Sequence, residues 1–104
     1  MKKEKLEIKT EINGDTATIL LTGRLDTETS EILESTLDTI IERVTFIILD
    51  MADLVYISSA GLRVMIATEK VLSRKKGKLT IINCQTKVKD VFSITGFTDI
   101  IDIS

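Results

Sequence analysis

Apolar and polar residues alternate along the first part of the chain, which predicts two paired strands. Leu6, Ile8 and Ile12 alternate with charged residues, the period of two that is typical of a strand with one buried face. Residues 16–22 have the composition of a returning strand. Asn13–Gly14 separates the two segments and is expected to supply both positive-φ positions of a tight turn, so that the strands pair antiparallel.

The spacing of the apolar residues becomes helical at Thr27. The residues at this spacing are Leu33, Leu37, Ile40, Ile41 and Val44. They predict a helix with one buried stripe, capped at its N-terminus by Asp26 or Thr27. The segment Phe46–Leu49 is continuously apolar and predicts a central strand that is covered on both faces.

A second helix is predicted from about Ser59 to Lys75. Its apolar residues form a broad stripe that should be buried. They are Leu62, Val64, Met65, Ile66, Ala67, Val71 and Leu72. Arg63, Lys70 and Arg74 fall together on the solvent side of this helix.

The last third of the chain continues the alternation of strand and helix. Gly77 should end the second helix, and residues 79–82 have the pattern of a strand. Residues 86–95 predict a short helix that stops at Gly96, and the apolar tail 97–103 predicts a short edge strand or a helical turn.

The order of these elements predicts a single compact α/β domain over residues 1–104. Strand–helix–strand alternation implies right-handed crossovers and parallel middle strands, and the N-terminal hairpin makes the sheet mixed. We expect four to five strands and three to four helices. A chain of 104 residues is long enough for one hydrophobic core and too short for two.

The charge balance and the lack of long apolar runs argue against nucleic-acid and membrane partners, and the cysteine content indicates the compartment. The chain has 14 basic and 16 acidic residues, whereas nucleic-acid-binding domains are normally basic. No apolar run approaches the roughly 18 residues of a membrane-spanning helix, and the charged start is not followed by the apolar core of a secretory signal. We therefore expect neither a nucleic-acid nor a membrane partner. The single cysteine, Cys84, fits a cytoplasmic protein kept reduced.

The chain contains no histidine, which removes the commonest general base and metal ligand. No Walker-type or Gly-x-Gly-x-x-Gly loop is present, so no nucleotide cofactor is expected. Asp26, Asp50 and Asp53 could share a cation, but oxygen-only sites usually need more ligands at defined spacing. Asp26 is interpreted as a helix cap rather than a catalytic acid, and Cys84 as a small buried residue rather than a reactive thiol. We expect no catalytic residue, cofactor or metal.

Polar side chains follow three of the predicted strands, in the loops 23–27, 50–59 and 83–86. Loops after parallel strands meet at one edge of a sheet. We therefore expect one rim to contain Asp26, Asp50 or Asp53, Ser58, Ser59 and Asn83.

Ser58 and Ser59 lie where the third strand gives way to the second helix, and they allow two interpretations. A serine at this place most often caps the helix. It can also be a regulatory hydroxyl, because a helix N-terminus tolerates a phosphate within its own domain. The small pair Ala60–Gly61 would leave the first turn open to another molecule, although Gly61 could equally permit close packing of helix on strand.

Three segments together resemble a known family. Asp53–Leu62 is similar to the signature of STAS domains, specifically the bacterial anti-sigma factor antagonists. Gly23–Asp26 resembles the Gly-x-Leu-Asp that follows the second strand in this family, and Val91–Phe97 resembles its last-helix pattern. The segments occur in the family's order and span nearly the whole chain. The resemblance implies a STAS-type fold and a partner-switching protein rather than an enzyme.

The resemblance also implies a mechanism and its residues. Unmodified members bind an anti-sigma factor that is also a serine kinase, and so free a sigma factor. The kinase phosphorylates the serine that opens the second helix, and a PP2C-type phosphatase removes the phosphate. Alignment on Gly61 makes this serine Ser59, with Ser58 as the alternative, because many members carry aspartate where this chain has Ser58. The expected docking surface of this monomer or weak dimer contains Asp26, Ser58, Ser59, Ala60, Gly61 and Arg63.

Two other classes of function remain to be compared. The same fold could be a scaffold in a stress-signalling complex or the STAS subunit of a transporter, with no phosphorylated serine. An enzyme fits less well, since a hydrolase based on Ser59 would lack a base. A receiver-like phosphoaspartate domain would need an acidic pair after the first strand and a lysine after a fifth, and neither is present.

Overall fold

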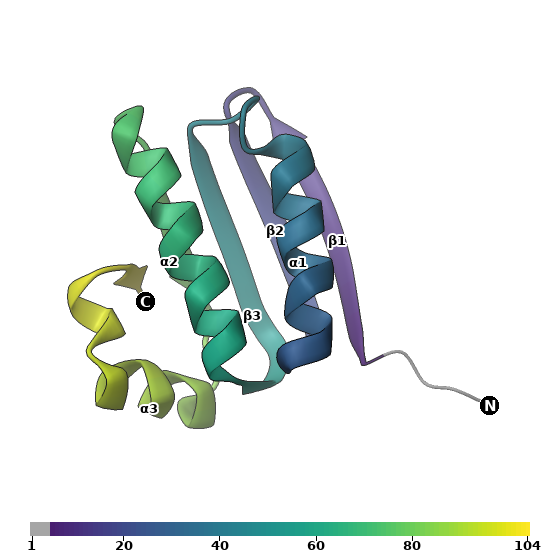
Figure 1. Ribbon diagram of the computed structural model, residues 1–104, viewed down its shortest axis with the longest axis vertical. Coiled ribbons are helices and arrows are strands. Elements are labelled where there is room, and N and C mark those ends of the chain that lie inside the picture. The colour runs from purple at the N-terminus through teal and green to yellow at the C-terminus, as the bar shows by residue number, and fades with distance from the viewer. Residues whose placement is uncertain (1–4) are drawn as a thin grey trace.

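The computed structural model describes residues 5–104 as a five-stranded mixed sheet with helices packed against it (Figure 1). Residues 1–4, which contain part of the charged start on which the expectation of no secretory signal depends, lie outside the described residues. The elements are β1 (Leu6–Asn13), β2 (Thr16–Leu25), α1 (Thr27–Ile40), β3 (Phe46–Ile57), α2 (Ser59–Arg74), β4 (Lys78–Ile82), α3 (Thr86–Thr95), a 3₁₀ turn (Phe97–Asp99) and β5 (Asp102–Ile103). The predicted α/β class, mixed sheet and numbers of strands and helices are confirmed.

The strands lie in the sheet in the same order as in the chain, β1-β2-β3-β4-β5. β1 pairs antiparallel with β2, and the remaining neighbours are parallel. Each parallel connection therefore leads from one strand to its neighbour on the same side, from β2 to β3 and from β3 to β4. Right-handed connections that all run in one direction along a sheet place their helices on the same face. Figure 1 shows α1 and α2 side by side on one face of the sheet. Because the strand order of residues 5–104 never reverses, this part of the chain has no switch point of the kind at which α/β sheets bind ligands.

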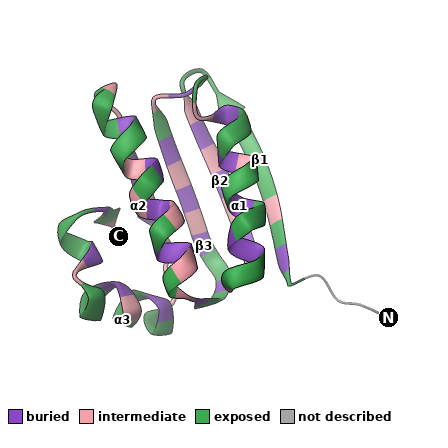
Figure 2. Ribbon diagram, viewed as in Figure 1, coloured by how far each residue is buried: buried purple, intermediate pink, exposed green. Residues whose placement is uncertain are grey.

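Only one face of β3 is fully covered, so the expectation of burial on both faces is wrong. Ile47 and Leu49 are completely buried, whereas Ile48 between them is partly exposed and Phe46 is exposed. The reason is the one-directional strand order, which places α1 and α2 on the same face. The apolar core accordingly lies between this face and the helices, as the alternation of buried and partly buried segments along the strands illustrates (Figure 2).

The hairpin turn lies one residue later than predicted. Asn13 pairs with Thr16, so the two central residues of the turn are Gly14 and Asp15. Gly14 has φ +66°, whereas Asn13 and Asp15 do not have positive φ. One positive φ at the first central position is typical of a type II′ turn. The antiparallel hairpin is confirmed, but its turn needs one positive-φ residue rather than two.

Two predicted boundaries are also wrong. α1 ends at Ile40, and Val44 is buried in the connection that follows rather than in the helix. β3 continues to Ile57 instead of ending near Leu49. Beyond Asp50 it pairs with β2 alone, through a ladder interrupted by register shifts. Backbone pairing with β2 therefore extends the strand through residues 50–57, where the sequence analysis predicts a loop.

The buried face of α2 is narrower than predicted. Its buried residues are Gly61, Leu62, Met65, Thr68 and Leu72. Val64 is only partly buried, and Ala67 and Val71 are exposed, because they face the space between α1 and α2 instead of the sheet. No helix within residues 5–104 is long and apolar enough to cross a membrane.

Candidate functional site

Ser58 fixes the start of α2 to the end of the sheet. It is the N-cap residue, and its Oγ accepts a hydrogen bond of 3.5 Å from the backbone N–H of Gly61. Its own backbone N–H donates to the carbonyl of Leu25 at 2.8 Å. Ser58 is therefore tied to both β2 and α2, and its side chain has a structural task.

Ser59 is the first residue within α2, and it is exposed. The cap is made by Ser58, and among residues 5–104 we find no hydrogen bond to the Ser59 hydroxyl. The first turn of α2 contains no acidic residue. Unpaired N–H groups and the helix dipole favour a negative charge at this position. The arrangement presents a hydroxyl that another molecule can reach and whose modification displaces no internal contact.

Gly61 is explained by packing. A Cβ at this position would lie 3.0 Å from Cγ1 of Ile57 and 3.3 Å from Cβ of Leu25, so the glycine lets α2 begin close to the ends of β2 and β3. Its backbone is buried, whereas the neighbouring Ala60 is partly exposed. The packing interpretation of Gly61 is thus sufficient, and its place in a docking surface stays a prediction.

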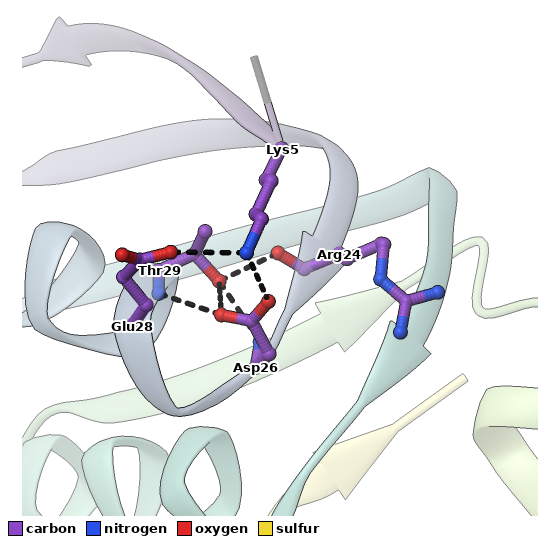
Figure 3. A network of polar contacts seen from close by, with 5 residues as sticks. All are labelled: Lys5, Arg24, Asp26, Glu28 and Thr29. Carbon is purple, nitrogen blue, oxygen red and sulfur yellow. Dashed lines mark hydrogen bonds and ion pairs between the residues drawn. The ribbon is translucent and has the colours of Figure 1, made fainter. Parts of the chain in front are cut away.

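Asp26 caps α1 through a reciprocal pair of hydrogen bonds with Thr29 (Figure 3). The N–H of Thr29 donates to Oδ1 of Asp26, and the N–H of Asp26 donates to Oγ1 of Thr29, both at 2.8 Å. The Thr29 hydroxyl also lies 2.7 Å from the carbonyl of Arg24. The Nζ atom of Lys5 lies 3.6 Å from Oδ2 of Asp26 and 3.0 Å from Oε1 of Glu28. This confirms Asp26 as the N-cap of the first helix.

The capping bonds also set the charge state of Asp26. The donated N–H of Thr29 holds the pKa of the Asp26 carboxyl below its ordinary value, and Lys5 acts in the same direction. Glu28 and Asp26 in turn raise the pKa of Lys5. The N-terminal end of α1, which lies beside the start of α2, therefore carries the ionised carboxylate of Asp26. The ammonium group of Lys5 partly balances its charge.

The predicted single rim is wrong, because its residues form two separate groups. Asp26, Ser58 and Ser59 follow the paired ends of β2 and β3. Asn83 instead donates from Nδ2 to Oδ1 of Asp50 at 3.2 Å, where β4 ends beside the middle of β3. Asp50 lies seven residues before the last residue of β3, on the order of 20 Å along an extended strand. The unexpected length of β3 separates the two groups.

Three exposed residues near Ser59 were missed by the sequence analysis. The guanidinium of Arg24 lies 4.3 Å from the centre of the Tyr56 ring, and Tyr56 and Val55 are large exposed side chains just before Ser58. Such stacking holds a cation over an aromatic face. The signal that could have identified them is the apolar composition of residues 54–57, which is typical of a strand rather than of the predicted loop. Exposed apolar side chains that lie a few residues before a reachable hydroxyl are candidates for a surface that binds another protein.

The described residues do not include a group of three or more acidic or cysteine side chains placed to hold a metal ion. Cys84 is partly buried and packs against the core, and this burial raises the pKa of its thiol. A thiol with a raised pKa is less often in its reactive thiolate form at neutral pH.

Comparison with known proteins identifies the family of this chain. The model of the STAS domain family matches residues 7–104. The anti-sigma-B factor antagonist of Bacillus subtilis is 29% identical over 92 residues, which are 88% of this chain and 84% of that protein. BtrV of Bordetella bronchiseptica is 40% identical over 58 residues, or 56% of this chain, and the match spans only 50% of BtrV.

Solved structures show the same fold. The unphosphorylated form of the anti-sigma factor antagonist SpoIIAA has a TM-score of 0.83 at 24% identity, covering 94% of this chain and 88% of that one. The phosphorylated form of SpoIIAA from Bacillus has a TM-score of 0.75 at 23% identity, covering 94% and 91%. At 24% and 23% sequence identity, these two likenesses establish the fold of this chain and nothing about its function.

Proposed function

Because the chain belongs to the STAS domain family, we propose that it is a cytoplasmic partner-switching regulator of the anti-sigma factor antagonist class. In the unmodified state it binds an anti-sigma factor that is also a serine kinase, and a sigma factor is thereby freed. The kinase transfers a phosphoryl group from ATP to Ser59, and a PP2C-type phosphatase hydrolyses the phosphoserine. The role of this chain is to bind and to be modified, and its own residues catalyse neither step.

The observation that carries this proposal is the division of tasks between two adjacent serines. Ser58 holds the helix start, whereas Ser59 is exposed at the first position of α2. A kinase needs a hydroxyl that can enter its active site without unfolding its substrate. Ser59 meets this requirement, and modification of Ser58 would break the capping bond. The relatives named as anti-sigma factor antagonists support the same role.

A phosphate at Ser59 can release a partner by electrostatics alone. Phosphoserine carries a charge of about −1.5 to −2 at pH 7. In the free protein it would lie at a helix N-terminus, which offsets it by roughly 0.3–1 kcal/mol. In a complex it would be buried without a counter-charge, at a cost of about 3–5 kcal/mol. A loss of 3–4 kcal/mol weakens binding a few hundredfold, so no change of fold is needed.

The docking surface is proposed to include the six predicted residues together with the exposed groups before α2. Arg63 lies one helical turn after Ser59 and is exposed, and Asp26 lies beside the start of α2. Tyr56 and Val55 add apolar area to these polar groups. Exposed apolar area together with charged groups is usual in protein–protein interfaces.

The proposal is tested by incubating the full chain with ATP and the anti-sigma factor kinase from the same genome, followed by intact-mass measurement. The wild type and Ser58→Ala should each gain one phosphate, and Ser59→Ala should gain none. Ser59→Asp should bind the kinase a few hundredfold more weakly than the wild type. If the wild type binds the kinase but gains no phosphate, the chain is a scaffold of the kind considered above. Tight binding by Ser59→Asp would contradict the electrostatic mechanism.

A further inference from the structure

A long groove runs between α1 and α2 on the outer side of the helical layer. Its larger part has a volume of about 570 Å³ and begins at Thr27 and Ala60, at the N-terminal ends of the two helices. A smaller hollow of about 70 Å³ continues it toward Ile41 and Val71. At the far end the Lys75 ammonium donates to the carbonyl of Ile41 and joins the two helices. The groove therefore follows the helices along most of their length.

The floor of the groove repeats at the spacing by which helices pack together. On α2 it is formed by Ala60, Val64, Ala67 and Val71, which are spaced by four, three and four residues. On the α1 side Ser30, Leu37 and Ile41 line it, seven and four residues apart and so on one face of the helix. This is the spacing at which one helix receives the side chains of another. The four α2 residues, none of which is fully buried against the sheet, thus form a second, outward-facing apolar stripe.

The two sides of the groove carry opposite charge. The α1 side has Glu31, Glu34 and Asp38, and the α2 side has Arg63 and Lys70, all exposed. Within residues 5–104, no ion pair joins an acidic residue of α1 to a basic residue of α2. The groove keeps the two rows apart, so each row is available to an occupant that lies between them.

Ser30 is buried beside the N-terminal end of the groove. Its side chain lines the groove near Thr27 and Ala60, and the residue is 2% exposed. Its Oγ has no hydrogen-bond partner among the described residues. Buried hydroxyls are normally paired, and ordered water commonly satisfies one that has no protein partner.

From these observations we propose that the groove between α1 and α2 is a docking site for an amphipathic helix of a partner protein. The helix has apolar side chains at spacings of four and three residues, basic residues along the flank that faces α1, and acidic residues along the flank that faces α2. Insertion of such a helix into an apolar groove is a common mode of recognition, and complementary charge fixes its direction. The site needs no phosphorylation, and at its N-terminal end it shares Ala60 and Arg63 with the docking surface proposed around Ser59.

The probe is a synthetic helical peptide about as long as α2, roughly 24 Å for its 16 residues. It has leucine at the stated spacing, lysine on one flank, glutamate on the other and a nitroxide at its N-terminus. Amide spectra of the isotope-labelled full chain should show saturable shifts around Val64 and Ala67 below about 1 mM peptide. Absence of saturable shifts overturns the proposal.

The direction of the bound peptide tests the charge argument. A helix that is turned end for end in a groove keeps its apolar face inward but exchanges its flanks. A second peptide with lysine and glutamate flanks exchanged should therefore bind in the opposite direction. The nitroxides of the two peptides should therefore broaden amides at opposite ends of the groove, one near Ser30 and the other near Ile41. Broadening at the same end with both peptides contradicts the proposal.

Matched variants show whether the groove itself is occupied. Lys70→Glu should weaken peptide binding about fivefold, whereas Lys87→Glu, an exposed lysine of α3, should change it by less than about twofold. Ala67→Trp should fill the groove and abolish the shifts, and Ala52→Trp should not. Equal effects within either pair argue against the groove. Sedimentation completes the test, because a wild-type dimer that Lys70→Glu dissociates would make a second copy the occupant and refute the partner helix.

Discussion

The strongest test of the site separates the two serines by their effect on stability. Ser58→Ala removes the acceptor of the Gly61 N–H at the start of a 16-residue helix. Loss of an N-cap costs about 0.5–2 kcal/mol, and the bond here is 3.5 Å long, so we expect the lower part of that range, about 0.5–1 kcal/mol. In a domain of this size 1 kcal/mol corresponds to about 4–8 °C. Ser58→Ala should therefore lower the Tm by about 2–8 °C.

Ser59→Ala should leave the free energy of unfolding within about 0.5 kcal/mol of the wild type. The side chain is exposed, the cap is provided by its neighbour, and alanine is the best helix former. Ser58→Asp is the matched control, since aspartate is an equally good cap and its charge is favoured at a helix N-terminus. It should restore the stability that Ser58→Ala loses.

The assay is urea unfolding followed by circular dichroism, with one m-value shared by all variants. A shared m-value means that differences in midpoint report stability rather than altered compactness of the unfolded chain. The reasoning is refuted if Ser59→Ala loses as much stability as Ser58→Ala. Ser59 would then hold the helix start, and a phosphate on it would disturb the fold instead of only the docking surface.

Three further predictions concern stability. Ser59→Asp should stay within about 1 kcal/mol of the wild type in thermal unfolding, because the helix dipole favours its charge, and a larger loss would contradict a purely electrostatic switch. Gly77→Ala should cost more than about 2 kcal/mol, since its Cβ would lie 1.7 Å from the carbonyl oxygen of Thr45. Gly96→Ala meets open space at φ +81° and should cost less, about 1–2 kcal/mol, so the reverse order in urea unfolding would contradict the packing argument. The pKa of Asp26 is lowered in the folded state, so its stabilisation is present above the ordinary pKa of 3.8 and is lost as the pH falls through the folded value. Asp26→Asn should flatten this acid dependence in urea midpoints measured between about pH 2 and 6, and an unchanged profile would contradict the assignment.

Local signals in the sequence determined much of the fold. The third helix begins at Thr86 and ends at Thr95 as predicted, with Gly96 in the left-handed conformation that glycine adopts most easily. Asp26 could be assigned as a cap because N-capping depends on residues within one turn. The strand and helix order followed from periodicity, and the family could be recognised from three short segments. The apolar tail formed both predicted alternatives, a 3₁₀ turn and a short edge strand.

Tertiary pairing decided what periodicity does not encode. β3 extends to Ile57 because β2 offers its backbone there, and this extension separates Asn83 from Ser59. Whether Ser58 or Ser59 caps α2 depended on where the strand ended and the helix began. The apolar residues of α2 divided between the sheet and the groove because the strand order places both long helices on one face. The sequence by itself determined which residues are apolar and where helices start, since these depend on near neighbours. Only the packed structure decided which surface each residue faces, because that depends on partners distant in the chain.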